Sequence, residues 1–394
     1  MPKTAILGAA RTPFGKLGQS LCTLDATELG ARAIAAALER SEVAPKQVEH
    51  VSFGQVLQAG QGQIPSRQAQ VKAGIGAEVT SETINKVCAS GLRTVSVLDT
   101  AIRAGDLDIG VAGGMESMSK APYLLSGARF GYRMGDAKAL DAMIEDGLKN
   151  PFSKKHMAAE ATEVASELEL TRPDMDRFAL RSHERAVAAT DEGRLAEEIC
   201  PVEIESKAKT TTVTDDEAPR RDASLEALAK LAAIFVEGGS HTAGNSPGVN
   251  DGAGALVVCS DEWARANDRT PWATVVSHAA VADDFAYLAK TPAAAAKAAL
   301  AKAGLTVDDI DLFEINEAFA SVAINSVTTL GIDEDKVNVN GGAIALGHPI
   351  GASGARILTT LVLELRRRGG GLGLCAICSG GGQGDAMIVE VNGG

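Results

Sequence analysis

NGGAIALGHPIGASG, residues 340–354, is the stretch that decides the fold. It holds one of only six histidines, His348, in a glycine-dense loop, and it ends where an amphipathic helix should begin. Glycine allows backbone conformations that other residues avoid and lets a ligand or another segment approach closely. A flexible surface loop would also explain the glycines, but such loops are rarely this apolar. The stretch therefore predicts a packed loop with a function.

The end of this stretch resembles a segment in the first half of the chain. Residues 352–356, ASGAR, match residues 89–93, ASGLR, which lie 263 positions earlier (352 − 89) and directly follow Cys88. Near the same offset, residues 31–56 resemble residues 293–318. Because several segments keep their order and spacing, the sequence predicts a duplicated domain.

The composition fits two or three packed domains and argues against nucleic acid as the main partner. The 394 residues are 45% hydrophobic and carry a net charge of −13, with a pI near 5.0. Nucleic-acid phosphates are bound through basic patches, so an acidic protein is a poor match for them. A small anionic ligand held in a local basic pocket is still allowed.

We expect a cytoplasmic protein with reduced thiols. The first residues, MPKTAILG, lack the charged-then-apolar pattern of a secretory signal, and no apolar run reaches the length of a membrane span. The cysteines are too sparse and irregular for a disulfide framework, lying at positions 22, 88, 200, 259, 375 and 378.

Strands and helices alternate in both halves, which predicts an α/β fold with helices on the faces of its sheets. In the first half we expect strands at 4–9, 48–56 and 108–113 and helices from Asp25 to Arg40 and after Cys88. In the second half we expect strands at 311–315 and 372–378 and helices at 293–303 and after residue 354. Asp25 and Glu28 suit a capping box, and Thr291-Pro292 suits the N-cap and first position of a helix.

Residues 120–250 have no counterpart in the repeat. Their pattern predicts helices near 158–168 and 173–189, followed by polar and charged connections. We therefore expect a lobe over the duplicated core. The expected parts are an N-terminal half (1–119 with 250–270), an inserted loop domain (120–249) and a C-terminal half (271–394).

Cys88 and His348 are the first candidates for catalysis. If the two halves pack as pseudo-symmetric sheets, their equivalent strand-to-helix turns meet, and a thiol would lie beside a base. The positive end of a helix macrodipole should also favour the thiolate of Cys88. A single cysteine is more often a small buried core residue, but its place in the repeat favours a nucleophile.

Cys375 and Cys378 form a C-x-x-C pair, which could indicate a metal or redox site. No second pair with zinc spacing exists, and the pair lies within a predicted strand. Alternation along that strand places Cys375 in the core and Cys378 on the opposite face. Cys378 would lie beside the glycine run 380–382, whose amides could bind an oxyanion. We expect no metal.

Asn316 ends a predicted strand. It suits either a turn or an amide that positions a water or stabilises an oxyanion. His156 suits the start of a helix. The remaining histidines are expected to be structural or on the surface, at positions 50, 183, 241 and 278.

Together these motifs resemble the thiolase family over essentially the whole chain. The resemblance rests on NKVCASG (85–91), NEAFA (316–320), NVNGG (338–342), GHP (347–349) and CSGGG (378–382). It implies two duplicated α/β halves with mixed five-stranded sheets that form a layered core. It also implies an inserted loop domain that covers the site and contributes oligomer contacts.

The resemblance implies the activity of an acetyl-CoA C-acetyltransferase. Cys88, activated by His348, would take an acyl group from acyl-CoA, and Cys378 would take an α-proton from a second acetyl-CoA. This ping-pong Claisen condensation gives acetoacetyl-CoA and CoA, and thiolysis is its reverse. The resemblance assigns one oxyanion hole to His348 and a water held by Asn316, and another to the amides of Cys88 and Gly380.

By the same resemblance, the insertion would bind coenzyme A. Arg220 would lie near the adenine and phosphates, and Ser246 near the pantetheine. Phe319 of the NEAFA motif joins the substrate-binding residues. Coenzyme A and acetyl-CoA are substrates, and no permanently bound cofactor is expected.

The expected acyl chain is short, because His156 and Met157 resemble the pair that narrows the acyl pocket of biosynthetic members. Ala158-Ala159-Glu160 and Ser379 depart from the biosynthetic pattern. A degradative 3-ketoacyl-CoA thiolase of broader chain length is therefore the alternative.

Three other classes compete with this interpretation. A ketoacyl synthase would have a histidine in place of Cys378. A non-catalytic acyl-CoA or sterol-carrier protein would have lost one of Cys88, His348 or Cys378, and all three are present. A redox or zinc protein rests on the C-x-x-C pair alone. Family members are dimers or tetramers, so we expect a homo-oligomer, preferably a tetramer, without nucleic-acid or membrane partners.

Overall fold

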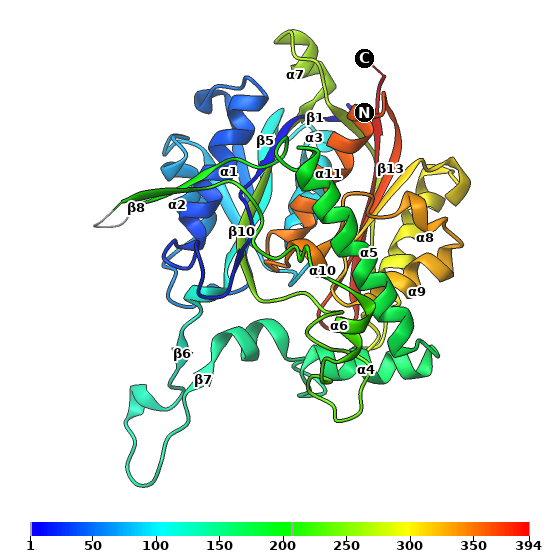
Figure 1. Ribbon diagram of the computed structural model, residues 1–394. Helices are drawn as coiled ribbons and strands as arrows, with labels where there is room; N and C mark the ends of the chain where they lie inside the picture. The colour runs from blue at the N-terminus through cyan, green and yellow to red at the C-terminus, as the bar shows by residue number, and fades with distance from the viewer. Residues whose placement is uncertain (1, 206–208, 394) are drawn as a thin grey trace.

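The structure, a computed structural model, describes residues 2–205 and 209–393 (Figure 1). Its helices are α1 (Ala26–Arg40), α2 (Pro65–Lys72), α3 (Ser90–Ala104), α4 (Met157–Glu167), α5 (Arg172–Asp191), α6 (Leu225–Ala229), α7 (Asp261–Ala266), α8 (Thr291–Ala303), α9 (Ala320–Leu330), α10 (Ala343–Leu346) and α11 (Ser353–Arg367). Its strands are β1 (Thr4–Arg11), β2 (Gly15–Lys16), β3 (His50–Gly54), β4 (Thr80–Ile84), β5 (Ile109–Ser117), β6 (Tyr123–Leu124), β7 (Leu140–Asp141), β8 (Val202–Glu205), β9 (Thr210–Val213), β10 (Asn250–Ser260), β11 (Ala273–Ala282), β12 (Leu312–Ile315), β13 (Gly371–Ser379) and β14 (Gln383–Val391).

The helix boundaries follow local chemistry. α1 begins at the expected capping box of Asp25 and Glu28. α8 ends at Gly304, whose φ of 70° is readily adopted only by glycine. The expected cap at Thr291 is wrong by one residue: Lys290 is the N-cap and Thr291 is already helical. The Thr291 Oγ1 lies 2.9 Å from Leu288 O and 2.7 Å from Gln383 O, so its single hydrogen is shared between two carbonyls and braces the helix start instead of capping it.

The core strands form one continuous ten-stranded arrangement, which consists of two mixed sheets joined edge to edge by β1 and β11, with the short β2 paired to β10. The first has the order β4-β3-β5-β10-β1, with β3 parallel to both of its neighbours and β10 antiparallel to both of its own. The second has the order β11-β14-β13-β12, in which only β12 and β13 are parallel. The antiparallel contact between β1 and β11 spans two residue pairs, Ala5 with Thr274 and Ile6 with Ala273.

The first sheet has five strands and ends in β4, whereas the second has four and ends in β12. In place of a fifth strand, the second sheet has a bridge of one residue pair. Beyond β12, Phe313 pairs with Val337 alone. The next residue, Asn338, has a φ of 49° and turns its side chain back onto β12. Its amide accepts from Ile315 N and donates to Ile315 O, both at 2.8 Å. The side chain thereby replaces the backbone ladder that a fifth strand would form.

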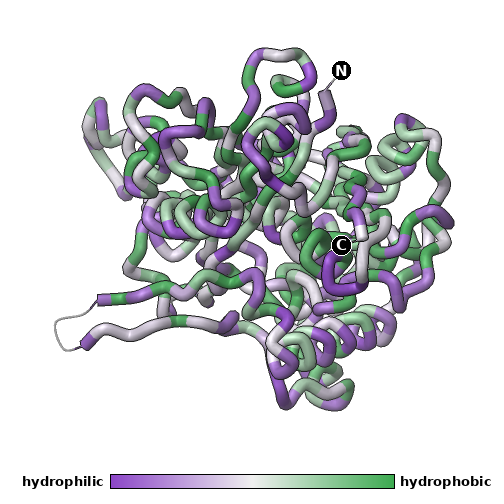
Figure 2. Tube along the Cα trace, turned by 90° about the horizontal axis from the view of Figure 1, so that it is seen from above, coloured by the Kyte–Doolittle hydropathy of each residue, from purple (hydrophilic) through white to green (hydrophobic). Residues whose placement is uncertain are grey.

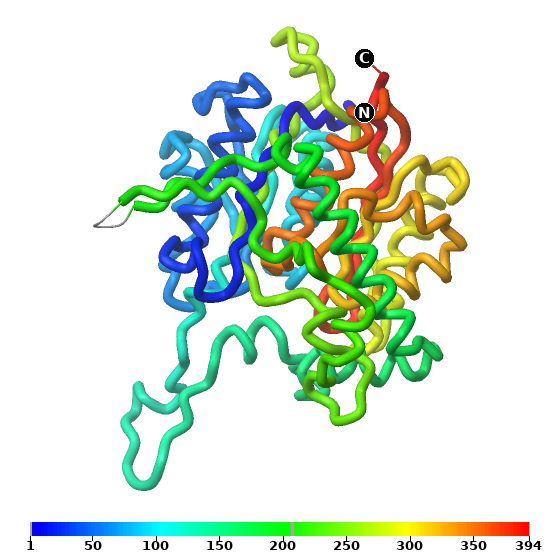
Figure 3. The backbone as a smooth tube through the Cα atoms, viewed as in Figure 1, coloured from blue at the N-terminus to red at the C-terminus, as the bar shows by residue number. Residues whose placement is uncertain are grey.

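The sheets form a layered core with helices between and outside them (Figures 1 and 3). α3 and α11 lie between the sheets and share one hydrophobic cluster with residues from both, including Leu92, Leu358, Leu256 and Met387. α1 covers the outer face of the first sheet, and α8 and α9 cover the outer face of the second. Each half therefore repeats the same strand-and-helix plan.

The two central helices touch at the glycines of the repeat. A Cβ added to Gly91 would lie 2.8 Å from Ala355 N, and one added to Gly354 would lie 2.3 Å from Leu92 N. Both obstacles are backbone atoms, which cannot move aside as a flexible side chain can. Only glycine lets the first turns of α3 and α11 approach this closely. The turn that carries Cys88 and the loop that carries His348 therefore meet, as the repeat predicted.

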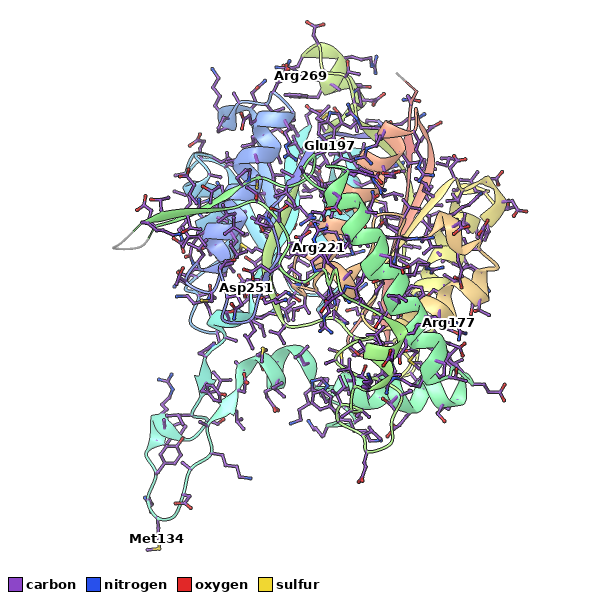
Figure 4. All side chains as sticks on the ribbon, viewed as in Figure 1. Met134, Arg177, Glu197, Arg221, Asp251 and Arg269 are labelled. Atoms are coloured by element: carbon purple, nitrogen blue, oxygen red, sulfur yellow. The ribbon has the colours of Figure 1, made fainter. Side chains whose placement is uncertain are left out.

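The insertion extends from this core. The β6–β7 hairpin projects away from it, with Met134 at its far tip (Figure 4). The β8–β9 hairpin runs outward as two adjacent strands (Figure 2). α5 is anchored to the core because Ser182 donates to Glu317 Oε2 (2.7 Å) and accepts from Gly342 N (3.1 Å).

Among the described residues, none of the helices combines the length and apolar composition needed to cross a bilayer.

We predict that Gly354→Ala destabilises the fold by about 3 kcal/mol, because the new methyl group would overlap the backbone of α3. Chemical denaturation of both proteins measures the change. Gly30→Ala in α1 is the matched control, because its nearest obstacle is the flexible end of Met115. An equal loss in both variants would contradict the special role of the contact between α3 and α11.

Candidate active site

One cavity of about 190 Å³ brings most of the expected site residues together. Cys88, His348 and Cys378 all line it. So do Gly380, Ser246, His156, Met157 and Phe319. Asn316 and Arg220 are not among the lining residues. The cavity therefore joins the turn before α3, the loop before α11, the end of β13 and the insertion.

Cys88 lies just before α3, as expected, but its surroundings do not favour the thiolate. The residue is only 4% exposed. Burial raises the pKa of Cys88 to about 12, and the negative charge of Glu116 adds to this effect. The backbone amides of Cys88 and Gly380 act in the opposite direction, but more weakly. Loss of water therefore opposes the thiolate that the helix dipole was expected to favour.

His348 is held by hydrogen bonds on one side only. Its Nδ1 lies 2.6 Å from Ser353 Oγ, and the Ser353 hydroxyl donates to Pro349 O at 2.9 Å. Because the single hydroxyl hydrogen is already used, Nδ1 must be the donor to Ser353. Nε2 then carries the lone pair, and it has no hydrogen-bond partner among the described residues. This tautomer suits a base that faces a thiol.

Burial keeps His348 neutral. It lowers the pKa of His348 to about 3, and the nearby positive charge of Arg356 lowers it further. The backbone N–H of His348 donates to Asn250 Oδ1 at 2.9 Å, which fixes the loop. At neutral pH the resting pair is therefore a thiol at Cys88 and a neutral imidazole at His348.

Cys378 lies at the end of β13 with its sulfur in the same cavity. Burial raises its pKa well above the ordinary value, and Cys88 raises it further. Cys375 packs in the hydrophobic cluster between the sheets. Cys378 packs in a separate cluster with Met157 and Ala318, the residue before Phe319. The opposite faces predicted for the two cysteines are confirmed. A shared metal is a poor fit for sulfurs directed into separate clusters.

Asn316 is fully buried directly after β12. Neither its Oδ1 nor its Nδ2 has a hydrogen-bond partner among the described residues. Buried amide atoms in folded proteins usually bind ordered water when no protein group is available. The side chain therefore fits the expected water-holding role.

The insertion supplies the walls of the cavity. His156 is the N-cap of α4, with Nδ1 accepting from Ala158 N at 3.1 Å, and its ring stacks on Phe235 at 3.7 Å between centroids. Met157 Sδ would lie 3.4 Å from a Cβ added to Gly380. These side chains therefore form part of the cavity wall near the cysteines.

Arg220 lines a neighbouring cavity of about 780 Å³ that shares Ser246, Pro247, Gly248 and Val249 with the first. Lys16 lines this second cavity as well. The adjacent Arg221 is instead paired with Asp191 at 2.6 Å. Of the two arginines, Arg220 is therefore the one that lines the second cavity. Residues 246–249 line both cavities and so connect Arg220 to the cysteines.

Sequence reasoning missed Ser353 and Glu116. Ser353 has a counterpart in the repeat, Ser90, which accepts from Lys86 N at 2.8 Å and donates to Val87 O three residues back, whereas Ser353 donates to Pro349 O four residues back. The repeat therefore contained the signal for Ser353. Glu116 is buried at the end of β5 and accepts from the backbone amides of residues 56, 57 and 351. Nothing in the sequence pattern indicates that contact.

We predict that alkylation of Cys88 by iodoacetamide accelerates about tenfold per pH unit from about pH 6 to 10, without a plateau. The reason is that the thiol, with its pKa raised to about 12, supplies more thiolate at each step. Mass spectrometry of the Cys88 peptide measures the rate, and Cys88→Ala is the control. A plateau below about pH 8 would indicate a preformed thiolate and contradict this prediction.

Comparison with known proteins agrees with this geometry. Residues 4–262 match the thiolase N-terminal domain, and residues 269–391 match the thiolase C-terminal domain. The chain is 49% identical to an acetyl-CoA acetyltransferase of Cupriavidus necator, covering 99% of this chain and 100% of that protein. It is 46% identical to one of Escherichia coli, covering 99% of each. A crystal structure of the Bacillus anthracis acetyl-CoA acetyltransferase superposes with a TM-score of 0.97 at 36% identity, covering 99% of both chains.

Fold, cavity and relatives together define an acyltransferase of the α/β class. More narrowly, the chain belongs to the thiolase family.

Proposed function

We propose that this protein is an acetyl-CoA C-acetyltransferase that forms an acyl-Cys88 intermediate. The observation that carries the proposal is the single cavity lined by Cys88, His348 and Cys378. It condenses two acetyl-CoA molecules to acetoacetyl-CoA and CoA, and it catalyses the reverse thiolysis. Every step uses groups of the chain, its CoA substrates and one water held by Asn316.

The first half-reaction acylates Cys88. His348 Nε2 takes the thiol proton as the sulfur attacks the thioester carbonyl, so no free thiolate has to persist in the buried site. The amides of Cys88 and Gly380 stabilise the oxyanion of the tetrahedral intermediate. The CoA thiolate leaves and takes a proton from Cys378. The site then holds an acetyl group on Cys88, a protonated His348 and a thiolate at Cys378.

The second half-reaction makes the carbon–carbon bond. The Cys378 thiolate takes an α-proton from a second acetyl-CoA. Because Nδ1 of His348 donates to Ser353, Nε2 can donate to the enolate oxygen only in this protonated state. A water held by Asn316 is the second donor. The enolate carbon attacks the acyl group, and the released Cys88 sulfur recovers its proton from His348.

The small cavity supports a short acyl chain. Met157 and Gly380 line both this cavity and a neighbouring one of about 740 Å³, so they form the wall between them. The larger cavity on the other side of this wall would hold a longer acyl group if the wall opened. A degradative thiolase for longer chains is therefore the second candidate.

The test of the function is thiolysis of acetoacetyl-CoA beside a long-chain 3-ketoacyl-CoA. We expect activity on acetoacetyl-CoA, its loss in Cys88→Ala, and little activity on the long chain. Met157→Ala should raise kcat/KM for the long chain by about tenfold because it opens the wall. Equal wild-type rates on both substrates would favour the degradative alternative, and no rate on either would contradict the proposal.

Coenzyme A would extend from the cysteines past Ser246 to Arg220. Ser246 Oγ is buried without a partner among the described residues, and Arg220 and Lys16, against the one acidic lining residue Glu217, give the second cavity a net positive charge. These local cations reconcile an anionic substrate with an acidic protein.

We predict that Arg220→Gln raises KM for CoA about tenfold with little change in kcat, since Arg220 would bind the substrate equally in ground and transition states. Initial-rate kinetics measure both constants. Arg221→Gln is the matched control, because that side chain is paired with Asp191. The same rise in both variants would contradict the assignment of Arg220.

We also propose that the protein is a homotetramer and lies in the cytoplasm. Its proposed domains are the N-terminal half (1–119 with 250–270), the inserted loop domain (120–249) and the C-terminal half (271–394). The projecting hairpin supports self-association, because it exposes Phe130 (92%) and Met134 (97%) together with other apolar side chains, Tyr123, Leu125 and Tyr132. A dimer is the alternative assembly.

A further inference from the structure

Ser379 is a buried polar residue directly after Cys378, at the end of β13. It is 1% exposed and lies in the catalytic cavity wall. Its hydroxyl donates to Lys86 O at 2.5 Å. Lys86 belongs to the first half of the chain, two residues before Cys88. One hydrogen bond therefore connects the residue after one catalytic cysteine to the turn that carries the other.

An ion pair between a partly exposed lysine and a buried aspartate repeats this connection. Lys86 Nζ pairs with Asp385 Oδ2, and the Asp385 side chain is only 2% exposed. Asp385 lies on β14 directly opposite Ile377, which precedes Cys378 on β13. The backbone carbonyl and the side chain of Lys86 are thus both attached to the strands around Cys378.

The contacts of Lys86 reach the catalytic sulfurs through only one or two residues of backbone on each side. Ser379 also precedes Gly380, whose amide reaches the sulfur of Cys88. Lys86 is followed by Val87, whose φ of 45° is a strained conformation for a β-branched residue. Surroundings that over-determine the position are needed to hold such a turn. Ser90 and Asn85 hold this turn locally, and the bonds from Ser379 and Asp385 add restraints from the other half of the chain.

We propose that Ser379, with Lys86 and Asp385, is a positioning unit that sets the distance between the Cys88 and Cys378 sulfurs. The inference rests on the proposed function, in which both sulfurs act on the same bound substrate. None of the three side chains takes part in bond making. Misplacement of a reacting group by a fraction of an ångström lowers the rate while leaving substrate affinity largely intact.

The first test is Ser379→Ala, assayed by thiolysis of acetoacetyl-CoA. We expect kcat to fall about tenfold, with KM within about twofold of the wild type. Ser379→Thr keeps the hydroxyl and should regain most of the activity. The melting temperature should change little, because Lys86 O still accepts from Ala89 N at 3.1 Å after the hydroxyl is removed.

Ser277→Ala is the matched control. The Ser277 hydroxyl is also buried and donates to a backbone carbonyl, Ala299 O, at 2.8 Å, but it lies away from the cysteines. It should leave kcat unchanged. A second variant, Asp385→Asn, removes the charge that holds Lys86 and should lower kcat with unchanged KM.

The outcomes separate this inference from the proposed function. Full kcat in Ser379→Ala, or an equal loss of kcat in Ser277→Ala, would overturn the positioning role while the function stands. A rise in KM that accounts for the whole loss would overturn it too. A wild-type protein without thiolysis activity would instead contradict the proposed function.

Discussion

The contact between Gly91 and Gly354 is the constraint on which the rest of the structure depends. Two helix starts can approach this closely only where neither has a side chain. Since each helix follows a turn or loop with a reactive residue, the contact converts a duplicated fold into a single site. Cys88 comes from one half, and His348 and Cys378 come from the other. The insertion then closes the cavity from outside.

Burial is the second controlling effect, and it explains the division of labour in the site. Loss of water raises the pKa of both cysteines and lowers that of His348, so the resting groups carry no charge. The charges that form during the reaction are stabilised by groups already in place. Backbone amides bind the oxyanion, and the fixed tautomer of His348 accepts the thiol proton on Nε2. Glu116 and Arg356 strengthen the neutral state, because one disfavours a thiolate and the other an imidazolium.

Much of this could be predicted from the sequence, because it depends on local pattern. The repeat predicted the duplication and the meeting of Cys88 with His348, and strand alternation separated Cys375 from Cys378. The ionisation of Cys88 could not be predicted, since it depends on how completely other segments exclude water. The bond from Ser379 to Lys86 joins residues 293 positions apart, so no local pattern shows it. Thr291 shows the same limit, because its hydroxyl bonds to a strand far along the chain.

The most direct test of the central claim is to mix the protein with acetyl-CoA alone and locate the acetyl group by peptide mass spectrometry. The account predicts one acetyl group on Cys88, formed together with free CoA that equals the sum of the acetyl-enzyme and any acetoacetyl-CoA produced by condensation. An acetyl group on Cys378, or no covalent adduct in a protein that still catalyses thiolysis, would contradict it.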